Sequence, residues 1–404
     1  MQYHEAIRWL FSTQMFGIKL GLDGPRQLLR HTLAYPEHGV RVIHVAGTNG
    51  KGSTCAMIDA VARAAGVRSG LFTSPHLIDY RERIRVSGVD IPEAACAERL
   101  TKLREICEGL DPHPTFFEIT LALAMRWFRE SGCELIVLET GMGGRLDATT
   151  AVDADVCVIT PVGLDHMQWL GNTLAEIAAE KAGILVSGKP CVSAPQEPAA
   201  AAVIEREANQ RRCPLDFIAA PLLGYHIALA GAHQRWNAAL ALQALHLADV
   251  RLSPDVVRHG LANVQWPARF ERLDGGRVVL DGAHNPQAAA VLARTWEETY
   301  PGEKAALVFS AVAAKDIHGI LTHLAPLAAR IFICPVDTPR ALAPEALAAH
   351  LPEGFAPHEC HQTLQAALAA ARASGWRVLV AGSLFLAGEA RAILTGGGFQ
   401  SSGQ

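Results

Sequence analysis

The stretch that decides the fold is Val42-Ile43-His44-Val45-Ala46-Gly47-Thr48-Asn49-Gly50-Lys51-Gly52-Ser53-Thr54. Its apolar, β-branched first part predicts a buried strand, and the segment from Ala56 to Ala65 predicts a helix. A glycine-rich loop between them lets backbone N–H groups point at phosphate oxygens, while Lys51 supplies a point charge. Gly52 follows Lys51 where the usual P-loop has Ser or Thr, so Ser53 or Thr54 must supply the Mg²⁺-binding hydroxyl. The alternative is a glycine-rich turn that binds nothing.

The composition is that of an ordinary globular protein. The chain has 404 residues, of which 50% are hydrophobic and 19% charged, and this length predicts two domains. A net charge of −4 gives no support for binding to nucleic acid or to a membrane surface. The sequence has no apolar run near the ~20 residues of a membrane span and no signal-peptide pattern. Nine cysteines without a C-x-x-C pair indicate a reducing, cytoplasmic location.

Polar residues follow two further predicted strands. Leu135–Glu139 is an apolar strand that ends in a carboxylate, and the strand Val156–Thr160 precedes a loop with Asp165 and His166. In an open parallel sheet, ligands bind outside the carboxyl ends of the strands. We therefore expect these groups to converge with the phosphate loop. A buried carboxylate is costly unless it is paired or bound to metal, and Mg²⁺ is the partner that suits a phosphate site.

The remaining segments carry weaker signals. Ser74-Pro75-His76-Leu77 follows a short predicted strand, and helices are expected over 92–109 and 116–130. Taken alone, Phe117 in the second of these helices fits a core position better than a ligand-stacking one. A capping box begins the helix that leads to Lys181, which on spacing alone is a solvated helix-end cation. Residues 195–231 read as Ala-rich and then irregular.

A second domain follows a change of pattern around Gln265-Trp266-Pro267. Apolar strands at 278–281, 306–310, 331–334 and 378–381 alternate with helix-like stretches, which predicts a smaller α/β domain with a mainly parallel sheet. The expected domains are residues 1–267 and 268–395. Residues 396–404 are expected to form a disordered tail.

With these pieces in order, the chain resembles the folylpolyglutamate synthase/dihydrofolate synthase family of the Mur ligase superfamily. The matching stretches are Gly47–Ser53, Ser74–Leu77, Glu139–Thr149, Leu164–Met167, Glu180–Ile184, His233-Gln234, Asn237–Ala239, Arg269–Glu271, Asp281–Pro286 and Gly382–Leu384. They cover most of the chain in the family's order. The resemblance implies a P-loop central domain, a Rossmann-like C-terminal domain and ATP-driven ligation of L-glutamate to a folate-type carboxylate.

The resemblance also implies roles for single residues. Lys51 and the loop amides would hold the ATP phosphates, Ser53 and Glu139 would bind one Mg²⁺, and His166 would bind a second. Lys181 would be a lysine that CO₂ can carbamylate, which turns a cation into an oxygen anion. Together with His284, the residues Lys51, His166 and Lys181 form the expected catalytic set.

Further residues are expected to bind the substrates. By the same resemblance, Asn237 would lie near the adenine, Arg269 at the phosphates and Asp281 at the ribose, while His284 and Ser383 would face the glutamate. Phe117 and Asp147 match positions that hold the pterin in members that make dihydrofolate, and Ser74, Pro75 and His76 match the substrate loop.

Three functions remain open at this point. The first is a bifunctional ligase, active on dihydropteroate and on folates, or a folylpolyglutamate synthase only. The second is a Mur-like ligase with another carboxylate acceptor. The third is a nucleotide-gated switch that hydrolyses ATP without ligation. We favour the bifunctional ligase, acting as a cytoplasmic monomer on small-molecule substrates.

Overall fold

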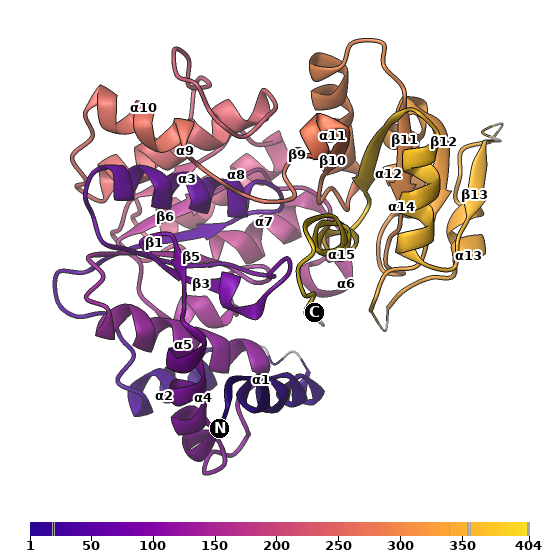
Figure 1. Cartoon of the computed structure of the whole chain (residues 1–404). Coiled ribbons are helices and arrows are strands. Elements are labelled where there is room, and N and C mark those ends of the chain that lie inside the picture. Colours follow the sequence, from indigo (N-terminus) through magenta and orange to yellow (C-terminus); the bar gives the residue numbers. More distant parts are fainter. Residues whose placement is uncertain (18, 20, 339, 354, 356, 402–404) are drawn as a thin grey trace. The chain divides into compact units, whose positions relative to one another are not determined.

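The computed structural model describes residues 1–401 except 18, 20, 339, 354 and 356 (Figure 1). The chain forms two compact units. Unit 1 comprises Met1–His76, Arg81–Ile227 and Arg235–Val264, and unit 2 comprises Leu77–Tyr80, Ala228–Gln234 and Gln265–Gln404. Each unit contains its own sheet.

The sheet of unit 1 has eight strands in the order β4-β3-β2-β5-β1-β6-β7-β8. Their bounds are β1 (Arg41–Ala46), β2 (Ser69–Phe72), β3 (Ile84–Val86), β4 (Val89–Asp90), β5 (Leu135–Glu139), β6 (Val156–Ile159), β7 (Cys191–Ser193) and β8 (Leu215–Phe217). All neighbours pair in parallel except β2–β3 and β3–β4. Because β1 lies between β5 and β6, the carboxyl ends of these three strands are adjacent, as the sequence predicted.

Helices cover both faces of this sheet. They are α1 (Tyr3–Ser12), α2 (Asp23–His31), α3 (Lys51–Ala64), α4 (Glu93–Cys107), α5 (Phe116–Glu130), α6 (Met167–Leu170), α7 (Leu174–Ala182), α8 (Pro198–Gln210), α9 (His233–Leu247) and α10 (Pro254–Ala262), with 3₁₀ turns η1 (Thr13–Phe16), η2 (Tyr80–Arg83) and η3 (Ala148–Ala151). In Figure 1, α3 and α10 lie on one side of the sheet, and α5 with α1, α2 and α4 lies on the other. Because helices cover both faces of the sheet, β1 and β5 are buried on both sides and are almost continuously apolar.

Helix α8 lies in the Ala-rich first part of the stretch 195–231, for which the sequence predicted no helix. Pro198 occupies the first turn of α8, where a missing N–H costs nothing. Ala200, Val203, Ile204 and Ala208 are buried at helical spacing. The sequence did not predict this helix because a run of alanines hides the 3.6-residue period that marks an amphipathic helix.

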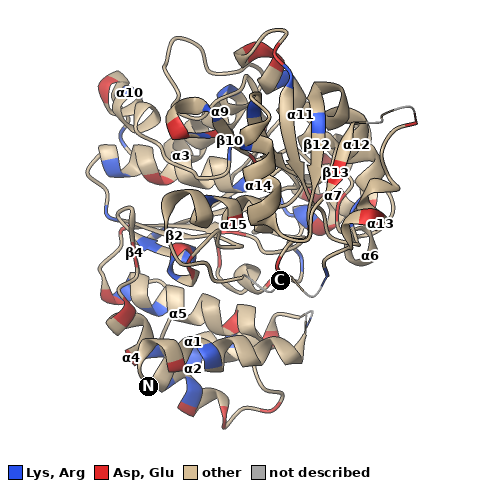
Figure 2. Ribbon diagram, turned by 45° about the vertical axis from the view of Figure 1, so that its right-hand side comes forward, with Lys and Arg blue, Asp and Glu red and all other residues tan. Residues whose placement is uncertain are grey.

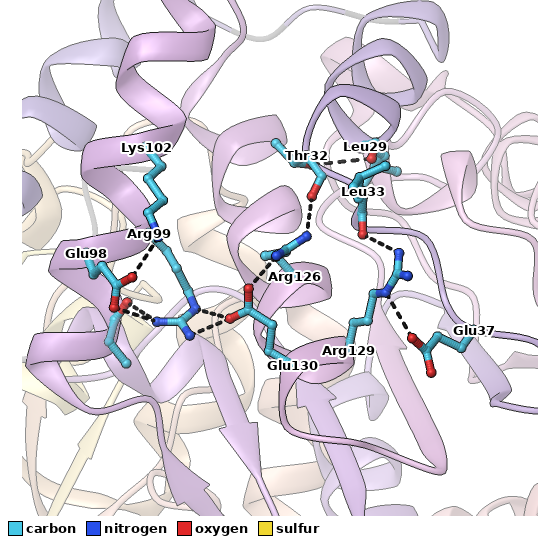
Figure 3. Close-up of polar contacts among 11 residues, drawn as sticks. Leu29, Thr32, Leu33, Glu37, Glu98, Arg99, Lys102, Arg126, Arg129 and Glu130 are labelled. Carbon is cyan, nitrogen blue, oxygen red and sulfur yellow. Dashed lines mark hydrogen bonds and ion pairs between the residues drawn. The ribbon is translucent and has the colours of Figure 1, made fainter.

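Two arginines of α5 bind the C-terminal end of α2 (Figure 3). Arg126 donates to the carbonyl oxygen of Thr32 at 3.1 Å, and Arg129 donates to that of Leu33 at 2.8 Å. Arg126 also pairs with Glu130. The last carbonyls of a helix have no intrahelical donor, so these contacts satisfy groups that would otherwise need water.

The sheet of unit 2 has six strands in the order β13-β12-β11-β14-β10-β9. Their bounds are β9 (Glu271–Leu273), β10 (Val278–Leu280), β11 (Ala305–Phe309), β12 (Ala328–Ile333), β13 (His358–Cys360) and β14 (Arg377–Ala381); the helices are α11 (Pro286–Thr299), α12 (Ile317–Leu324), α13 (Pro344–Ala348), α14 (Leu364–Ala373) and α15 (Leu384–Thr395), with η4 (Asp274–Gly276) and η5 (Ala325–Leu327). Within the described residues, β9 and β10 pair in antiparallel orientation, and the other neighbouring strands of this sheet pair in parallel. The last strand in the chain, β14, lies between β11 and β10.

Alternate residues of these strands fill two separate cores. Val279, Leu307 and Leu379 belong to the core that contains Trp296 of α11. Residues one position away on the same strands face the other core, which packs against α14 and α15. Helix α15 was not predicted from the sequence, although its start at Ser383 had been singled out for function. The predicted α/β class with mainly parallel sheets is confirmed.

The C-terminal segment is described as far as residue 401. The Gln400 amide donates to the Ile78 carbonyl at 2.8 Å, and its side-chain oxygen accepts from the Tyr80 amide at 3.0 Å. The rest of the tail that was predicted to be disordered, residues 402–404, lies outside the described residues.

Surface charge and cysteines fit the composition. Lys and Arg are interspersed with Asp and Glu along the helices (Figure 2), as in α4, where Lys102 pairs with Glu98 and Arg104 with Glu108. All nine cysteines have free thiols, and eight of them are buried. Over the part of the chain that the structure describes, none of the helices combines the length and apolar character needed to cross a bilayer.

Candidate nucleotide and acceptor site

The phosphate loop joins β1 to α3. Gly47 has a φ of +147° and Gly50 a φ of +89°, which favour glycine. A Cβ on Gly47 would lie 1.8 Å from Oγ1 of Thr160. The Thr48 hydroxyl is 3.0 Å from both the N–H and the carbonyl oxygen of Gly163, so the loop after β6 braces the phosphate loop. Helix α3 begins at Lys51, so its N-terminal amides face the loop.

Two lysines meet at one carbonyl of this loop. Lys51 Nζ donates to the carbonyl oxygens of Gly47 at 3.1 Å and Thr48 at 3.2 Å, and Lys181 Nζ donates to that of Gly47 at 2.7 Å. Lys181 is only 3% exposed. Its burial, and secondly the charge of Lys51, lower its pKa to about 7, against the opposing effect of Asp165 and Asp147. Lys181 is therefore not the solvated helix-end cation that its spacing alone allowed.

Glu139 and Ser53 lie on adjacent elements. Glu139 ends β5, is 5% exposed, and accepts a hydrogen bond from the Ser74 amide at 3.1 Å. After burial itself, the charge of Glu139 is the largest cause of the raised pKa of Cys55. Cys55 lies two residues beyond the buried Ser53, and α3 packs against β5.

His166 occupies a different environment. It precedes α6 with a φ of +52° and has a side chain that is 44% exposed. Its Nε2 is 4.0 Å from Oδ1 of Asp165. Among the described residues, His, Cys, Asp and Glu side chains nowhere gather in the threes that a protein-only metal site needs. Mg²⁺ suits such a site because it usually takes one or two protein ligands, with phosphate oxygens and waters completing the shell.

The predicted acceptor residues surround the loop after β5. The ring of Phe117 lies against the backbone of Gly141, since a Cβ there would be 2.7 Å from the ring, and packs against Phe72 at 5.7 Å between centroids. Phe117 is half-buried. Asp147 is buried, and burial raises its pKa although the Thr149 and Met142 donors oppose the shift.

The other substrate-loop and nucleotide residues of unit 1 have distinct contacts. Pro75 follows a cis peptide bond after Ser74. His76 is 4% exposed, and its Nδ1 accepts from Nε of Arg83 at 2.8 Å. Asn237 of α9 faces the phosphate loop, because a Cβ on Gly50 would lie 2.8 Å from its Oδ1.

In unit 2, Asp281 organises the turn that carries Arg269. Its two carboxylate oxygens accept from the amides of Phe270 and Ala283, each at 2.8 Å. Phe270 has a φ of +48°, a conformation that is strained for an aromatic residue and that the Asp281 bond helps to hold. Burial raises the pKa of Asp281, and Arg269 is the strongest opposing influence.

His284 and Ser383 lie at the starts of two helices of unit 2. Nδ1 of His284 is 2.8 Å from the carbonyl oxygen of Gly282. Ser383 is the N-cap of α15, and its hydroxyl accepts from the Phe385 amide at 3.1 Å. Ser383 therefore has a helix-capping role that the sequence had not indicated.

Sequence reasoning missed three residues that support the predicted ones. Thr160 lies against Gly47, Thr149 donates to Asp147, and His44 contacts Thr149. His44 carried a signal, because it is the single polar residue inside the apolar run of β1. The two threonines carried none, since a threonine near a strand end is common.

Comparisons with known proteins identify the family of the chain. Residues 45–213 match the Mur ligase middle domain, and residues 268–384 match the Mur ligase glutamate ligase domain. The chain is 36% identical over 372 residues to the dihydrofolate synthase/folylpolyglutamate synthase of Bacillus subtilis, which covers 84% of this chain and 86% of that protein. It is also 36% identical over 428 residues to a probable bifunctional folylpolyglutamate synthase/dihydropteroate synthase of Haloferax volcanii; the match covers 98% of this chain but about half, 51%, of that longer protein.

A solved structure matches almost the whole chain. It is the bifunctional folylpolyglutamate synthase/dihydrofolate synthase of Yersinia pestis complexed with AMPPNP and Mn ion, with a TM-score of 0.88, 30% identity and 98% coverage of each chain. The resemblance inferred from the motifs is confirmed. The chain therefore belongs to the folylpolyglutamate synthase/dihydrofolate synthase family of Mur ligases, which are ATP-dependent acid–amino-acid ligases.

Proposed function

We propose that the chain adds L-glutamate both to dihydropteroate and to reduced folates, with ATP and Mg²⁺. The observation that carries the proposal is that Lys181 and its neighbour Glu180 join two loops: Lys181 Nζ donates to the Gly47 carbonyl, which Lys51 also contacts, and the Arg145 amide of the loop that carries Asp147 donates to the Glu180 carbonyl at 2.7 Å. A phosphate-binding loop and a candidate pterin-binding loop thus lie together in unit 1. Transfer of a phosphoryl group to a bound carboxylate needs such proximity.

The proposed reaction has two steps. An oxygen of the acceptor carboxylate attacks the γ-phosphorus of ATP, the bond to the β,γ-bridging oxygen breaks, and ADP leaves. The amine of glutamate then attacks the acyl carbon of the acyl phosphate, and the tetrahedral intermediate expels phosphate while the nitrogen loses a proton. Phosphoryl transfer of this kind depends on positioning and on stabilisation of negative charge, which Lys51 and the loop amides supply.

Ser53, Glu139 and His166 are the proposed protein ligands of Mg²⁺. The oxygen donors Ser53 and Glu139 suit the first metal ion, which when bound neutralises charge on the transferred phosphoryl group. The Yersinia pestis relative is complexed with AMPPNP and Mn ion, which supports the binding of a divalent ion together with the nucleotide. A neutral imidazole is a less typical Mg²⁺ ligand, so the second ion at His166 rests on the family resemblance.

Lys181 is a proposed site of carbamylation. An amine reacts with CO₂ only in its neutral form, and a pKa of about 7 leaves a large neutral fraction at physiological pH. We expect removal of dissolved CO₂ to lower the ligase rate and bicarbonate to restore it in the wild type. The Lys181→Arg variant keeps a cation that cannot be carbamylated, so a normal bicarbonate response in that variant would refute the assignment.

The C-terminal residues complete the proposal. We assign Arg269 and Asp281 to the nucleotide, and His284 and Ser383 to glutamate, in a domain of residues 268–395 that follows an ATP-binding domain of residues 1–267. Under this assignment His284→Ala should raise the KM for glutamate, and Asp281→Asn should raise the KM for ATP. The opposite pattern would exchange the two roles.

The deciding experiment measures phosphate release from ATP with Mg²⁺ and L-glutamate, with dihydropteroate or tetrahydrofolate added separately. Release that needs glutamate together with each acceptor is the expected result. Release with tetrahydrofolate only would leave a folylpolyglutamate synthase. No response to either acceptor, from a folded protein that binds ATP, would favour a Mur-like ligase with another acceptor, and acceptor-independent release would favour a switch.

Phe117 provides a sharper test of the dihydropteroate step. Its half-buried ring beside Gly141 is a surface on which a pterin can stack. We expect Phe117→Ala to reduce activity with dihydropteroate about tenfold more than activity with tetrahydrofolate, if stacking contributes about 1–1.5 kcal/mol. An equal loss with both acceptors would remove the argument for bifunctionality.

We also propose that the protein acts as a monomer in the cytoplasm, on small molecules and not on nucleic acid or membranes. The nine free thiols fit a reducing compartment, and the net charge is only −4. Sedimentation at micromolar concentration should give the mass of one chain, 43.2 kDa. A stable mass of two chains would contradict the monomer.

A further inference from the structure

His44 is a fully enclosed polar residue in β1. Its side chain is 1% exposed, and its Nε2 lies 2.8 Å from Oγ1 of Thr149, which is also fully buried. Such a group is costly to bury unless it makes a specific hydrogen bond. This bond joins the strand that leads into the phosphate loop to the loop that carries Asp147.

The chemistry of the partners fixes the direction of the hydrogen-bond chain. Oγ1 of Thr149 is 2.5 Å from Oδ1 of Asp147, and the Thr149 amide donates to the same oxygen at 3.0 Å. Since the carboxylate accepts, the Thr149 hydroxyl donates its only proton to Asp147 and accepts from Nε2–H of His44. Burial lowers the pKa of His44 to about 3, so the ring is neutral and its one proton is on Nε2.

The series of hydrogen bonds from His44 through Thr149 ends at the Asp147 carboxylate, whose orientation is fixed by several donors. Oδ2 of Asp147 accepts from the Met142 amide at 2.8 Å, so the carboxylate ties both ends of its loop together. A carboxylate offers about four acceptor positions; these bonds use three, and the Gly141 backbone amide also interacts with Asp147. The orientation that the carboxylate presents to a ligand is therefore set by these donors, and Thr149 is held in turn by His44.

We propose that His44 is a positioning residue for the acceptor, which acts through Thr149 on the Asp147 carboxylate. This inference rests on the proposed function, in which Asp147 holds the pterin. Gly47 follows His44 by three residues, so one strand aligns the acceptor loop with the phosphate loop. An orientation fixed in this way favours the geometry that attack on ATP requires.

Paired substitutions separate positioning from simple packing. Thr149→Val keeps the shape but removes the hydroxyl, whereas Thr149→Ser keeps the hydroxyl. His44→Leu removes the donor, whereas the amide nitrogen of His44→Gln can occupy the place of Nε2. Thr13→Val is the matched control, because Thr13 is 2% exposed and its hydroxyl donates to the Leu10 carbonyl, three residues earlier, at 2.6 Å.

The experiment measures the KM for dihydropteroate and the KM for ATP, together with the melting temperature, for the five variants. We expect Thr149→Val and His44→Leu to raise the KM for dihydropteroate roughly tenfold, the loss that one buried hydrogen bond produces. The KM for ATP should stay within about twofold. Thr149→Ser and His44→Gln should restore most of the acceptor affinity, and Thr13→Val should leave both constants unchanged.

Two outcomes would overturn the inference. One is an unchanged KM for dihydropteroate in both Thr149→Val and His44→Leu. The other is a fall in melting temperature with equal effects on both substrates and no rescue by serine or glutamine, which is the pattern of a packing residue. If instead the wild type does not use dihydropteroate at all, the proposed function fails first, which the activity assay alone reveals.

Discussion

Gly47 is the residue at which the nucleotide site tolerates least change. An added Cβ would lie 1.8 Å from Oγ1 and 3.0 Å from the carbonyl oxygen of Thr160, and the φ of +147° is one that alanine rarely adopts. We expect Gly47→Ala to weaken ATP binding at least about 100-fold in a calorimetric titration, because about 3 kcal/mol of strain must be relieved by moving the loop. Gly109→Ala, which meets only the Ile106 carbonyl at 3.5 Å, is the control and should bind ATP normally.

Lys181 makes the stability of unit 1 depend on pH. Its pKa falls from the ordinary 10.5 to about 7 in the folded chain, so between these values the unfolded chain binds more protons. The free energy of unfolding must therefore rise with pH from 7 towards 10.5, by up to about 1.4 kcal/mol per pH unit. We expect the free energy of unfolding, measured with denaturant in CO₂-free buffer, to rise from pH 7.5 to pH 9.5. This rise should be about 2 kcal/mol larger in the wild type than in Lys181→Met. Parallel pH curves for the two proteins would contradict the buried, neutral amine.

At this scale the sequence predicted residue types better than residue environments. Lys51 and Glu139 follow from local pattern, since a phosphate loop and a strand that ends in a carboxylate are both contiguous in sequence. The burial of Lys181, and the bond from His44 to Thr149 over 105 positions, depend on strand order and helix packing. The residues of each contact lie more than 100 positions apart in the sequence, so local sequence patterns could not reveal these contacts.

Among the elements, the contact between α2 and α5 makes a measurable contribution to stability. Arg126→Met removes the hydrogen bond to the Thr32 carbonyl and the pairing with Glu130 (Figure 3). We expect the free energy of unfolding to fall by about 1 kcal/mol, because the carbonyl is only partly shielded and water can replace the donor. Arg206→Met is the control. Its exposed contact with Glu207, at 3.5 Å, should contribute less than about 0.5 kcal/mol, and equal losses in the two variants would argue against the helix-end contact.

Element prediction succeeded where the apolar period is clear and failed where it is not. Strand β5 was predicted with its observed bounds, and β1 with its strand–loop–helix sequel. The elements missed include the helices α8 and α15 and the short strands β7, β8 and β13, which have three residues each. Three-residue strands are defined by their neighbours in the sheet more than by their own sequence, so their assignment needs the tertiary structure.

For the whole molecule, we expect two unfolding transitions. Each unit has its own sheet and its own buried core, and multidomain proteins commonly depart from two-state behaviour. A calorimetric scan without ligand should therefore need two components, with the calorimetric enthalpy exceeding the van't Hoff enthalpy. A single transition in which the two enthalpies agree would contradict independent units.

The place of β14 constrains how the protein can be made. During synthesis the N-terminal unit has all of its strands once Phe217 has been translated. The sheet of unit 2 differs, because β10 and β11 do not pair with each other and must wait for residues 377–381. Until residues 377–381 have been translated, two apolar strands have exposed edges, which are open to pairing with other nascent chains. A ribosome that stalls or terminates shortly before codon 377 would thus release a chain with a folded first half and an aggregation-prone second half.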